Sequence, residues 1–417
     1  MPSSIQYDIV WVMAAEIEFI PEGTVTSPEG FFAGATSAGI NKKNKDKPDL
    51  GILFSEAPCV AAGLFTANRI KAAPVVLSQR RLKQGRVGAV VVNSGCANTC
   101  VGERGIRDAT KMAKLVAEGI GILPEDVLVA STGVIGVPLP MKRITSAIEQ
   151  VILSRDGGHE LARAMMTTDT FAKETAVKVR VGNSEFTIGG VAKGVGMIHP
   201  DLATLLCFLT TDAAVEKDFL QEALKKAVDI SFNMVSIDGD TSPSDMVLLM
   251  ANGLAASEPI SSGSEPADAF EQGLETVCVH LAKCIARDGE GATKLIEVIV
   301  SGARNLAEAR LAARTIVSSL LVKAAVHGAD PNWGRIMAAL GRSGVEVVES
   351  KTDLYIGDIP VVKAGVPLPF SQRGVIKLLE GKEVSISLNL NLGSSSATGW
   401  GCDLSEEYVT INSQYMT

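Results

Sequence analysis

The sequence predicts an α/β fold, because apolar runs typical of strands alternate with amphipathic stretches typical of helices along most of the chain. Residues 88–92 form an apolar run that ends in a polar turn, which predicts a buried strand. From about Glu103 to Ile120, apolar residues recur at helical spacing and predict an amphipathic helix. Residues 295–300 form another strand-like run between two helical stretches. This alternation specifies the class of fold and leaves the order of the strands open.

The other expected elements follow in order along the chain. Residues 178–181 and 185–191, joined by a short polar turn, predict a β-hairpin. Residues 255–268, rich in Ser, Glu and Pro, predict a surface loop. The pair Asp330-Pro331 is typical of a helix start, with the aspartate as cap and the proline in the first turn. Further helices are expected at residues 141–152, 219–232, 269–286 and 306–326, and further strands at residues 247–250 and 384–390.

Length and composition are those of an ordinary globular protein. The chain has 417 residues, enough for a large core and for two domains or lobes. Its net charge is −8 with Lys and Arg scattered along the chain, which argues against nucleic acid as the main partner. No segment approaches the ~20 apolar residues of a membrane span, and the basic start of a secretory signal is missing. We therefore expect a cytoplasmic protein that binds neither nucleic acid nor membrane.

We expect neither a metal nor a bound cofactor. The seven cysteines are irregularly spaced and lack the Cys/His pairing of zinc sites, so small buried hydrophobic residues in a reducing compartment are expected. Asp238 and Asp240 alternate like the start of a calcium loop, but Pro243 and Leu249 stand where that loop needs Gly and Glu. We expect this block to shape the wall of an active site instead. Neither a Walker A loop nor a GxGxxG motif is present.

Thr204 stands where a catalytic nucleophile can be formed. It begins an apolar run, residues 205–209, directly after a loop interrupted by Gly and Pro. A threonine hydroxyl is a weak nucleophile unless a base lies beside it, and the simplest such base is the α-amino group of the same threonine. Because that amine is free only at an N-terminus, a catalytic Thr204 requires cleavage between Ala203 and Thr204. Taken alone, a threonine here is more often the first residue of a strand.

Residues 192–206 resemble the self-cleavage site of the ornithine acetyltransferase (ArgJ) family, which shares the KGxGMI run, the proline and the Ala-Thr pair. The chain departs from the common family pattern at Val195, Asp201 and Met416, none of which supplies a catalytic atom. Further family blocks occur in the family's order at residues 130–136, 166–170, 236–241, 287–294, 330–335 and 397–417.

The resemblance implies a four-layer αββα sandwich core, like that of ArgJ and DmpA proteins, with a smaller C-terminal α/β domain at about residues 285–400. It also implies self-cleavage into an α chain, residues 1–203, and a β chain, residues 204–417. The tail at residues 401–417 would return to the active site. The expected activity is that of a glutamate N-acetyltransferase of arginine biosynthesis. An acetyl-Thr204 intermediate would carry the acetyl group from N2-acetyl-L-ornithine to L-glutamate, in an α2β2 heterotetramer.

The resemblance also assigns roles to single residues. Thr132 and Gly133 match the family's oxyanion pair, although Ser-Thr-Gly is also common in plain turns. Lys193 would meet an α-carboxylate or tune the Thr204 amine, and Glu290 would hold an ammonium group. On their own, Lys193 and Glu290 would more often be solvated surface charges. The catalytic residues are then Thr204, Thr132 and Gly133, cleavage falls between Ala203 and Thr204, and the substrate-binding residues are Thr167, Lys193, Thr204, Glu290, Asn412 and Thr417.

Three functional alternatives stay open at this point. Some family members use acetyl-CoA to acetylate glutamate directly, so acetyl-CoA is a possible co-substrate of a bifunctional enzyme. If water replaced glutamate as the acceptor, the same nucleophile would serve a self-processing amidohydrolase or aminopeptidase. A binding protein without catalytic activity would keep the bond between Ala203 and Thr204 intact.

Overall fold

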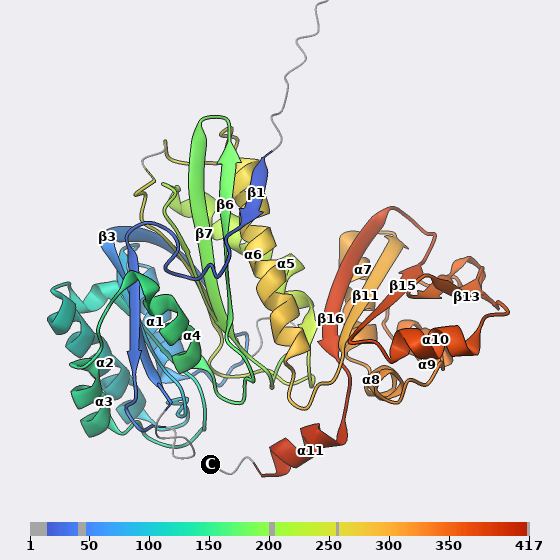
Figure 1. The fold of residues 1–417 in the computed structure, drawn as a ribbon, viewed down its shortest axis with the longest axis horizontal. Coiled ribbons are helices and arrows are strands. Elements are labelled where there is room, and N and C mark those ends of the chain that lie inside the picture. The colour runs from blue at the N-terminus through green and yellow to red at the C-terminus, as the bar shows by residue number, and fades with distance from the viewer. Residues whose placement is uncertain (1–14, 41–46, 200–204, 256–257, 415–417) are drawn as a thin grey trace, which may run out of the picture.

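The computed structural model describes residues 15–40, 47–199, 205–255 and 258–414. Within these residues the strands form one sheet of nine and another of seven. Figure 1 shows the two sheets in neighbouring bodies, with helices packed against both. The α/β class predicted from the alternation of strands and helices is therefore confirmed.

The nine-stranded sheet is folded back on itself at β3. Residues 50–54 of this long strand pair with β2 and β4, whereas residues 60–65 pair with β10. The register shifts between Phe54 and Cys59, and a bulge of this kind bends a strand. Strand order is β1 (Glu16–Phe19), β6 (Lys173–Val181), β7 (Ser184–Lys193), β8 (Leu206–Thr211), β10 (Met246–Ala251), β3 (Leu50–Phe65), β4 (Val87–Asn93) and β5 (Val127–Ser131), with β2 (Phe31–Thr36) beside β3.

The bend produces two facing layers with an apolar core between them. Val90 of β4 and Phe208 of β8 belong to this inner core, together with Leu161 of α4 (Gly158–Met165). The neighbouring residue Val91 points to the opposite face, because successive side chains of a strand alternate. Each layer therefore has an outer apolar face that must also be covered.

Helices cover both outer faces and complete the four-layer αββα sandwich that the family resemblance implies. On one side Met112 of α2 and Ile144 of α3 pack against Val91. On the other side α6 packs on β6 and β7, with α5 beside it. Figure 1 shows these helices flanking the strands. The covering helices are α1 (Ala73–Leu82), α2 (Glu103–Ile120), α3 (Met141–Ile148), α5 (Lys217–Ile230) and α6 (Ala267–Arg287).

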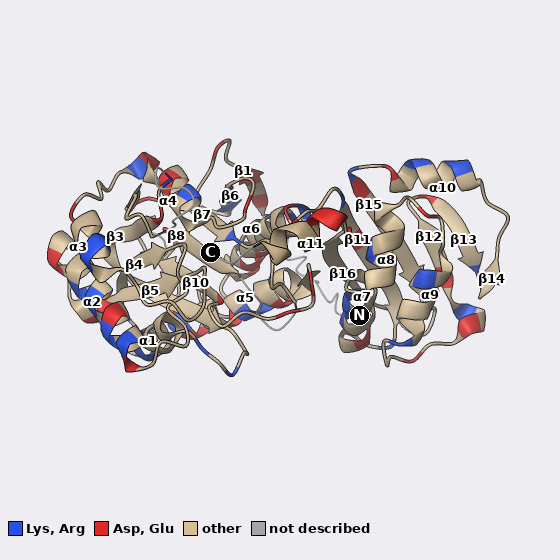
Figure 2. Ribbon diagram, turned by 90° about the horizontal axis from the view of Figure 1, so that it is seen from below, with Lys and Arg blue, Asp and Glu red and all other residues tan. Residues whose placement is uncertain are grey.

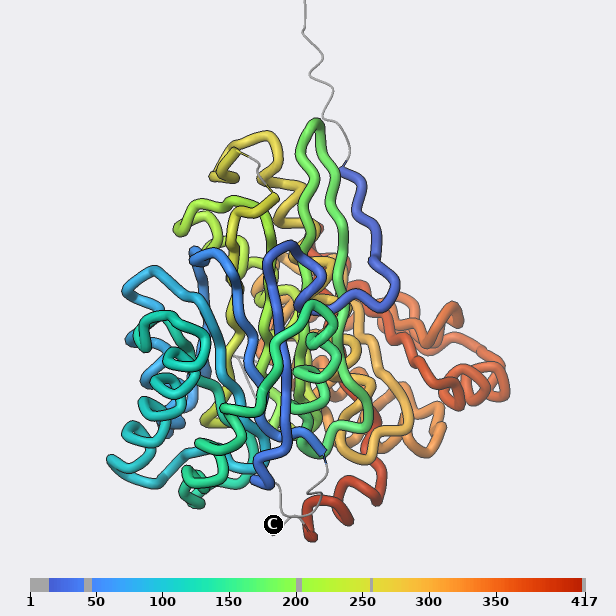
Figure 3. The backbone as a smooth tube through the Cα atoms, turned by 60° about the vertical axis from the view of Figure 1, so that its left-hand side comes forward, coloured from blue at the N-terminus to red at the C-terminus, as the bar shows by residue number. Residues whose placement is uncertain are grey.

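The seven-stranded sheet forms the core of the second, C-terminal body. Its order is β14 (Val366–Pro367), β13 (Ile359–Lys363), β12 (Asp353–Ile356), β15 (Glu383–Asn389), β11 (Leu295–Ala303), β16 (Ser395–Cys402) and β9 (Val235–Ser236). The helices of this body are α7 (Leu306–Val317), α8 (Leu320–His327), α9 (Gly334–Gly341) and α10 (Gln372–Leu379). α11 (Glu406–Ser413) then extends beneath the first body (Figures 1 and 3). The domain boundaries given above stay a prediction.

Most expected elements are present with small shifts of their ends. The predicted hairpin is β6–β7, which rises at one end of the molecule with β1 along its edge (Figure 3). The strand at residues 88–92 is β4, and the helix from Glu103 is α2.

Three expectations about helices are wrong. The helix at residues 306–326 is two helices, because the backbone at Ser319 is extended. The helix that starts at Met141 ends at Ile148 instead of residue 152. Asp330-Pro331 does not start a helix: the Trp333 N–H donates to the Pro331 carbonyl in a tight turn, and α9 begins at Gly334.

Two cysteines also differ from expectation, since Cys100 is exposed and Cys284 is half-buried.

Charged residues of both signs are mixed over the surface. Figure 2 shows Lys and Arg interleaved with Asp and Glu, for example along α2. Among the described residues, no helix combines the length and the apolar character needed to cross a membrane. The cytoplasmic location expected above stays a prediction.

Candidate active site

A pocket lined by both polar and apolar side chains opens where the end of β7 meets the loop after β5, the loop before β10, the turn after α6 and the helix α11. It brings together the described residues of the predicted site, although they are far apart in the sequence. Ala203, Thr204 and Thr417 lie outside the described residues. The pocket is lined by Thr132, Gly133, Thr167, Lys193, Glu290 and Asn412, and also by Ala97, Ile135, Thr168, Val195, Gly196, Met197, Ser242, Pro243 and Ser244.

The chain that follows the predicted cleavage point enters the sheet beside this pocket. Leu206, two residues after Thr204 in the sequence, pairs with the pocket residue Lys193 at the end of β7. The Leu205 carbonyl accepts a hydrogen bond from the Met246 N–H at 3.0 Å. The residue that follows Thr204 is therefore held between β7 and β10, next to the pocket.

The loop that leads toward the cleavage point is fixed by Asp238. Its carboxylate accepts hydrogen bonds from the N–H groups of Met197, at 2.6 Å, and Ile198, at 2.9 Å. Met197 has a φ of +52°, a backbone conformation that L-residues rarely adopt. The Asp238 carboxylate comes from a loop distant in the sequence and stabilises this strained turn. The same block supplies Ser242 and Ser244 to the pocket wall, as expected from the sequence.

The predicted oxyanion pair lies at the break after β5. Thr132 is buried, and its N–H donates to the Asn93 carbonyl at 3.0 Å. Asn93 also accepts a hydrogen bond from the Ser131 hydroxyl, at 2.6 Å, so the strand ends of β4 and β5 are tied together. Gly133 has a φ of +127°, which favours glycine. The pair is thus held on rigid strand ends and borders the pocket.

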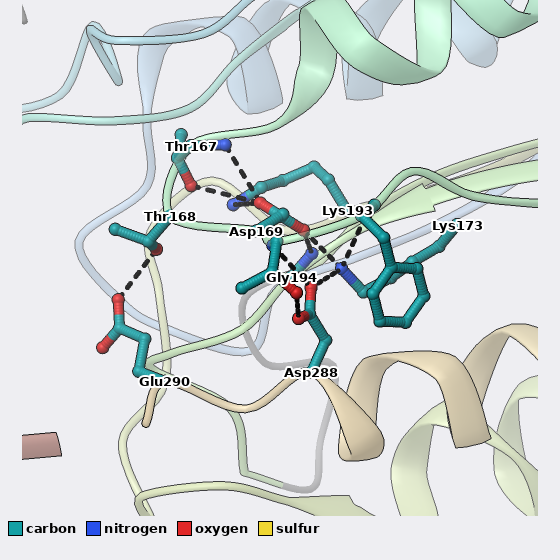
Figure 4. A network of polar contacts seen from close by, with 10 residues as sticks. Thr167, Thr168, Asp169, Lys173, Lys193, Gly194, Asp288 and Glu290 are labelled. Atoms are coloured by element: carbon teal, nitrogen blue, oxygen red, sulfur yellow. Dashed lines mark hydrogen bonds and ion pairs between the residues drawn. The ribbon is translucent and has the colours of Figure 1, made fainter. Parts of the chain in front are cut away.

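Thr167 and Thr168 follow α4 and project from a short turn organised by Asp169. The Asp169 carboxylate accepts hydrogen bonds from the Thr167 N–H and the Gly194 N–H, each at 3.0 Å. The Thr168 hydroxyl donates to a Glu290 carboxylate oxygen at 2.8 Å. Figure 4 shows the contact of Thr168 with Glu290 beside the separate set of contacts that Asp169 makes.

Lys193 is buried, so the alternative that it is a solvated surface charge is wrong. Burial lowers the pKa of Lys193, the nearby Asp169 carboxylate opposes that shift, and the Lys173 ammonium adds to it. Burial by itself would raise the pKa of Asp169, but the charges of Lys193 and Lys173 outweigh it and hold that pKa well below its usual range. The pocket residue Lys193 is therefore part of a buried charge network that continues behind the pocket wall.

Glu290 and Asn412 connect the pocket to the C-terminal helix. The Glu290 N–H donates to the Val195 carbonyl at 2.8 Å, which places the turn after α6 against the loop that leads toward the cut. The Asn412 side-chain amide donates to the Glu290 carboxylate at 2.8 Å. α11 thus reaches the pocket through a direct contact.

Several pocket and support residues were missed in the sequence analysis. Thr168 follows a predicted site residue and could have been included for that reason alone. Asp169, Lys173 and Asp288 stand in or near family blocks, but the sequence does not indicate that their charges meet in the interior. Only the fold brings residues 169–173 next to residue 288.

The four-layer αββα sandwich, with a pocket beside the start of the central strand β8, defines the class: an α/β protein with the ArgJ/DmpA-like fold expected from the sequence. The family model described as "ArgJ family" matches residues 32–417. The chain therefore belongs to the ArgJ family.

Curated relatives align over almost the whole chain. "Arginine biosynthesis bifunctional protein ArgJ" of Dehalococcoides mccartyi is 52% identical over 405 residues, covering 97% of this chain and 100% of the relative. The protein of the same name from Symbiobacterium thermophilum is 52% identical over 397 residues, covering 95% of this chain and 99% of the relative. A solved structure of ornithine acetyltransferase with ornithine from Mycobacterium tuberculosis is 37% identical, covers 46% of this chain and 100% of the solved chain, and has a TM-score of 0.42.

Proposed function

We propose that this protein is a self-processing acetyltransferase that moves an acetyl group from N2-acetyl-L-ornithine to L-glutamate through an acetyl-Thr204 intermediate. The observation that carries the proposal is the convergence of Thr132, Gly133, Lys193 and Glu290 on one pocket, beside the start of β8. Family membership and the names of the relatives support the same reaction. The reaction would belong to arginine biosynthesis, and no bound cofactor is part of the proposal.

Self-cleavage would come first. The Thr204 hydroxyl attacks the Ala203 carbonyl carbon, the peptide C–N bond breaks, and an ester joins the two residues. Water then hydrolyses the ester and leaves Ala203 with a carboxylate and Thr204 with a free α-amine. That amine is the base the hydroxyl needs for the second reaction. The strained turn at Met197 and its anchor Asp238 support a bent backbone before the cut.

Acetyl transfer would then follow a ping-pong course. The Thr204 amine accepts the proton as the hydroxyl oxygen attacks the acetyl carbonyl, and the negative charge develops on the carbonyl oxygen. The Thr132 hydroxyl and the Gly133 N–H would donate hydrogen bonds to that oxygen, and both residues border the pocket. The C–N bond breaks, ornithine leaves with the proton on its α-amine, and the acetyl ester of Thr204 remains. The α-amine of glutamate attacks this ester and regenerates the hydroxyl.

The substrate would be held by charges of opposite sign. The Lys193 ammonium suits an α-carboxylate, which both amino acids carry. The Glu290 carboxylate suits the side-chain ammonium of ornithine. Thr167, Asn412 and Thr417 complete the proposed contacts, the first two from the pocket wall.

The relatives carry the word "bifunctional" in their names, so a second acetyl donor is part of the proposal. We propose acetyl-CoA as that co-substrate. Glutamate incubated with acetyl-CoA and no acetylornithine should then yield N-acetylglutamate. A monofunctional enzyme would form it only from acetylornithine.

Self-cleavage is tested by intact mass and N-terminal sequencing of purified protein. We expect two chains, with Thr204 as the second N-terminus. Thr204→Ala should remain a single inactive chain, whereas Thr204→Ser retains a hydroxyl and should still be cut. A single full-length species in an active preparation would contradict the mechanism.

Transfer is distinguished from hydrolysis by the acceptor. Purified protein is incubated with N-acetylornithine, with and without glutamate. N-acetylglutamate should form only when glutamate is present. Free acetate at the same rate in both reactions would assign the protein as an amidohydrolase.

A further inference from the structure

Four buried charges lie together behind the wall of the pocket. The side chains of Asp169 and Lys173 are fully buried, and those of Asp288 and Lys193 are 3% and 4% exposed. The two carboxylates and the two ammonium groups of this set balance each other, and the nearby Glu290 and Asp245 carboxylates also act on Lys193. Lys193 lines the pocket, whereas Lys173 is not among its lining residues. Figure 4 shows both lysines beside Asp169.

Lys173 bridges the two carboxylates. Its Nζ donates to Asp169 Oδ1 at 2.8 Å and to Asp288 Oδ2 at 2.6 Å. The same ammonium lies 4.9 Å from the centre of the Phe171 ring, a cation–π contact. One residue therefore bridges two acids that come from opposite sides of the proposed cut.

Each of these acids in turn positions residues of the pocket. Asp169 accepts hydrogen bonds from the N–H groups of Thr167 and Gly194, and Thr167 lines the pocket. Asp288 accepts the Thr170 N–H at 3.0 Å and stands two residues before Glu290. The bridge by Lys173 therefore connects the threonine turn, the end of β7 and the turn that carries Glu290.

Lys193 lies within ion-pair distance of Asp169 but does not donate a hydrogen bond to it. Its Nζ lies 3.9 Å from Asp169 Oδ2, beyond hydrogen-bond distance, while Lys173 holds the other oxygen at 2.8 Å. The two ammonium groups repel each other, so an Asp169 carboxylate that already accepts a hydrogen bond from Lys173 attracts Lys193 less strongly. The Lys193 ammonium consequently keeps its capacity to bind an anion in the pocket.

We propose that Lys173 is a positioning residue for substrate binding: by donating hydrogen bonds to both Asp169 and Asp288, it keeps Lys193 from forming a hydrogen-bonded pair with Asp169 and leaves the Lys193 N–H groups for a ligand carboxylate. The proposal rests on the proposed function, because it takes an amino acid with an α-carboxylate as the ligand. Lys173 acts through other residues and has no direct contact with the pocket.

The test uses a pair of variants that separates folding from positioning. Lys173→Met leaves two buried acids with one lysine, and this imbalance is expected to impair folding. Lys173→Met/Asp288→Asn restores the charge balance of these four groups, so it should fold, and Lys193 is then the only one of the two lysines left to pair with Asp169. We expect the double variant to bind L-ornithine, the probe in calorimetry, at least about tenfold more weakly than wild type, a loss of about 1.4 kcal/mol. The KM for N-acetylornithine should rise by a similar factor, with a smaller change in kcat.

Lys323→Met is the matched control. Lys323 is also buried, but its ammonium donates to the carbonyls of Ser236 and Cys402 and does not line the pocket. Its removal should lower the Tm and leave the Kd for ornithine unchanged. An equal loss of affinity in this control would mean that any missing buried lysine has the same effect, and the proposal would be wrong.

The other outcomes are equally decisive. A folded double variant with the wild-type Kd would overturn the positioning role. Failure of both Lys173 variants to fold would assign the cluster to folding alone and would also overturn it. Wild-type protein that binds ornithine without transferring acetyl would contradict the proposed function and leave the positioning role standing. Wild-type protein that does not bind ornithine would contradict the proposed ligand.

Discussion

At the scale of single residues, the proposed oxyanion hole combines a side-chain donor with a backbone donor. Thr132 would contribute its hydroxyl and Gly133 its N–H, and both border the pocket. Substitution can remove the first donor outright, whereas it can only displace the second. The two positions therefore allow separate tests.

Thr132→Ala is expected to lower kcat by about 10²–10³, because one hydrogen bond to the developing negative charge is lost. The KM for N-acetylornithine should change far less, since that donor matters mainly in the transition state. Steady-state kinetics of the cleaved variant measure both. A kcat near that of wild type, or an effect on KM alone, would make Thr132 an ordinary turn residue.

Gly133→Ala is expected to destabilise the protein rather than only slow the reaction. An added Cβ would lie 2.4 Å from the Gly95 carbonyl carbon and 2.6 Å from the Cys96 nitrogen, and the φ of +127° disfavours a side chain. We expect a loss of about 1–3 kcal/mol in the free energy of unfolding, measured by chemical denaturation. Gly136→Ala is the control, because Gly136 also has a positive φ but an added Cβ would meet nothing within 4 Å. Equal effects of the two substitutions would refute the clash.

At the scale of elements, Asp403 anchors the chain between β16 and α11. Its buried carboxylate accepts hydrogen bonds from the N–H groups of Thr293 and Lys294, each at 2.8 Å, and contacts His327 Nδ1 at 2.8 Å. Burial by itself would raise the pKa of Asp403, but the hydrogen bonds from Thr293 and His327 outweigh it and hold that pKa below its usual value. The carboxylate is therefore favoured in the folded state.

This lowered pKa gives stability a defined dependence on pH. The contribution of Asp403 is fully present above the unfolded-state pKa of about 3.9 and is lost as the pH falls through the lower folded-state value. Asp403→Asn should lower the free energy of unfolding by about 1.5–3 kcal/mol at pH 7. The difference from wild type should shrink below about pH 4. Denaturation curves between pH 3 and 7 measure it, and a constant difference would contradict the assignment.

The secondary elements themselves were largely predictable, because helices such as α2 and strands such as β4 carry strong local patterns. The break between α7 and α8 was not predictable, because Ser318 and Ser319 are not strong signals for the end of a helix. The extended backbone at Ser319 separates the two helices. The bend in β3 was also not predictable. It depends on which partner strands pair with each half.

At the scale of the whole molecule, strands from both sides of the predicted cut alternate in one sheet. β8 and β10 follow residue 204, yet they lie between β7 and β3, which precede it. Separation of the two chains would break the pairing of β7 with β8 and of β10 with β3, and would expose the inner core. The cleaved chains should therefore behave as one folded unit.

We expect the two chains to co-elute in size-exclusion chromatography and to separate only under denaturing conditions. Native mass spectrometry gives the number of chains in the particle, for which we propose α2β2. A particle with one pair of chains would contradict the heterotetramer but not the pairing. Elution of either chain alone under native conditions would contradict the interleaved sheet.

The sequence by itself determined the α/β class, the family, and the identity of the candidate nucleophile, because these depend on local patterns and on contiguous blocks. The tertiary structure decided which residues meet. It places Thr132, Lys193, Glu290 and Asn412 around one pocket and Lys173 behind it. Whether a lysine is a solvated charge or a buried bridge depends on the segments that cover it, and these lie more than a hundred residues away in the case of Asp288. Burial and charge pairing are properties of the packed chain, so they appear only when the layers come together.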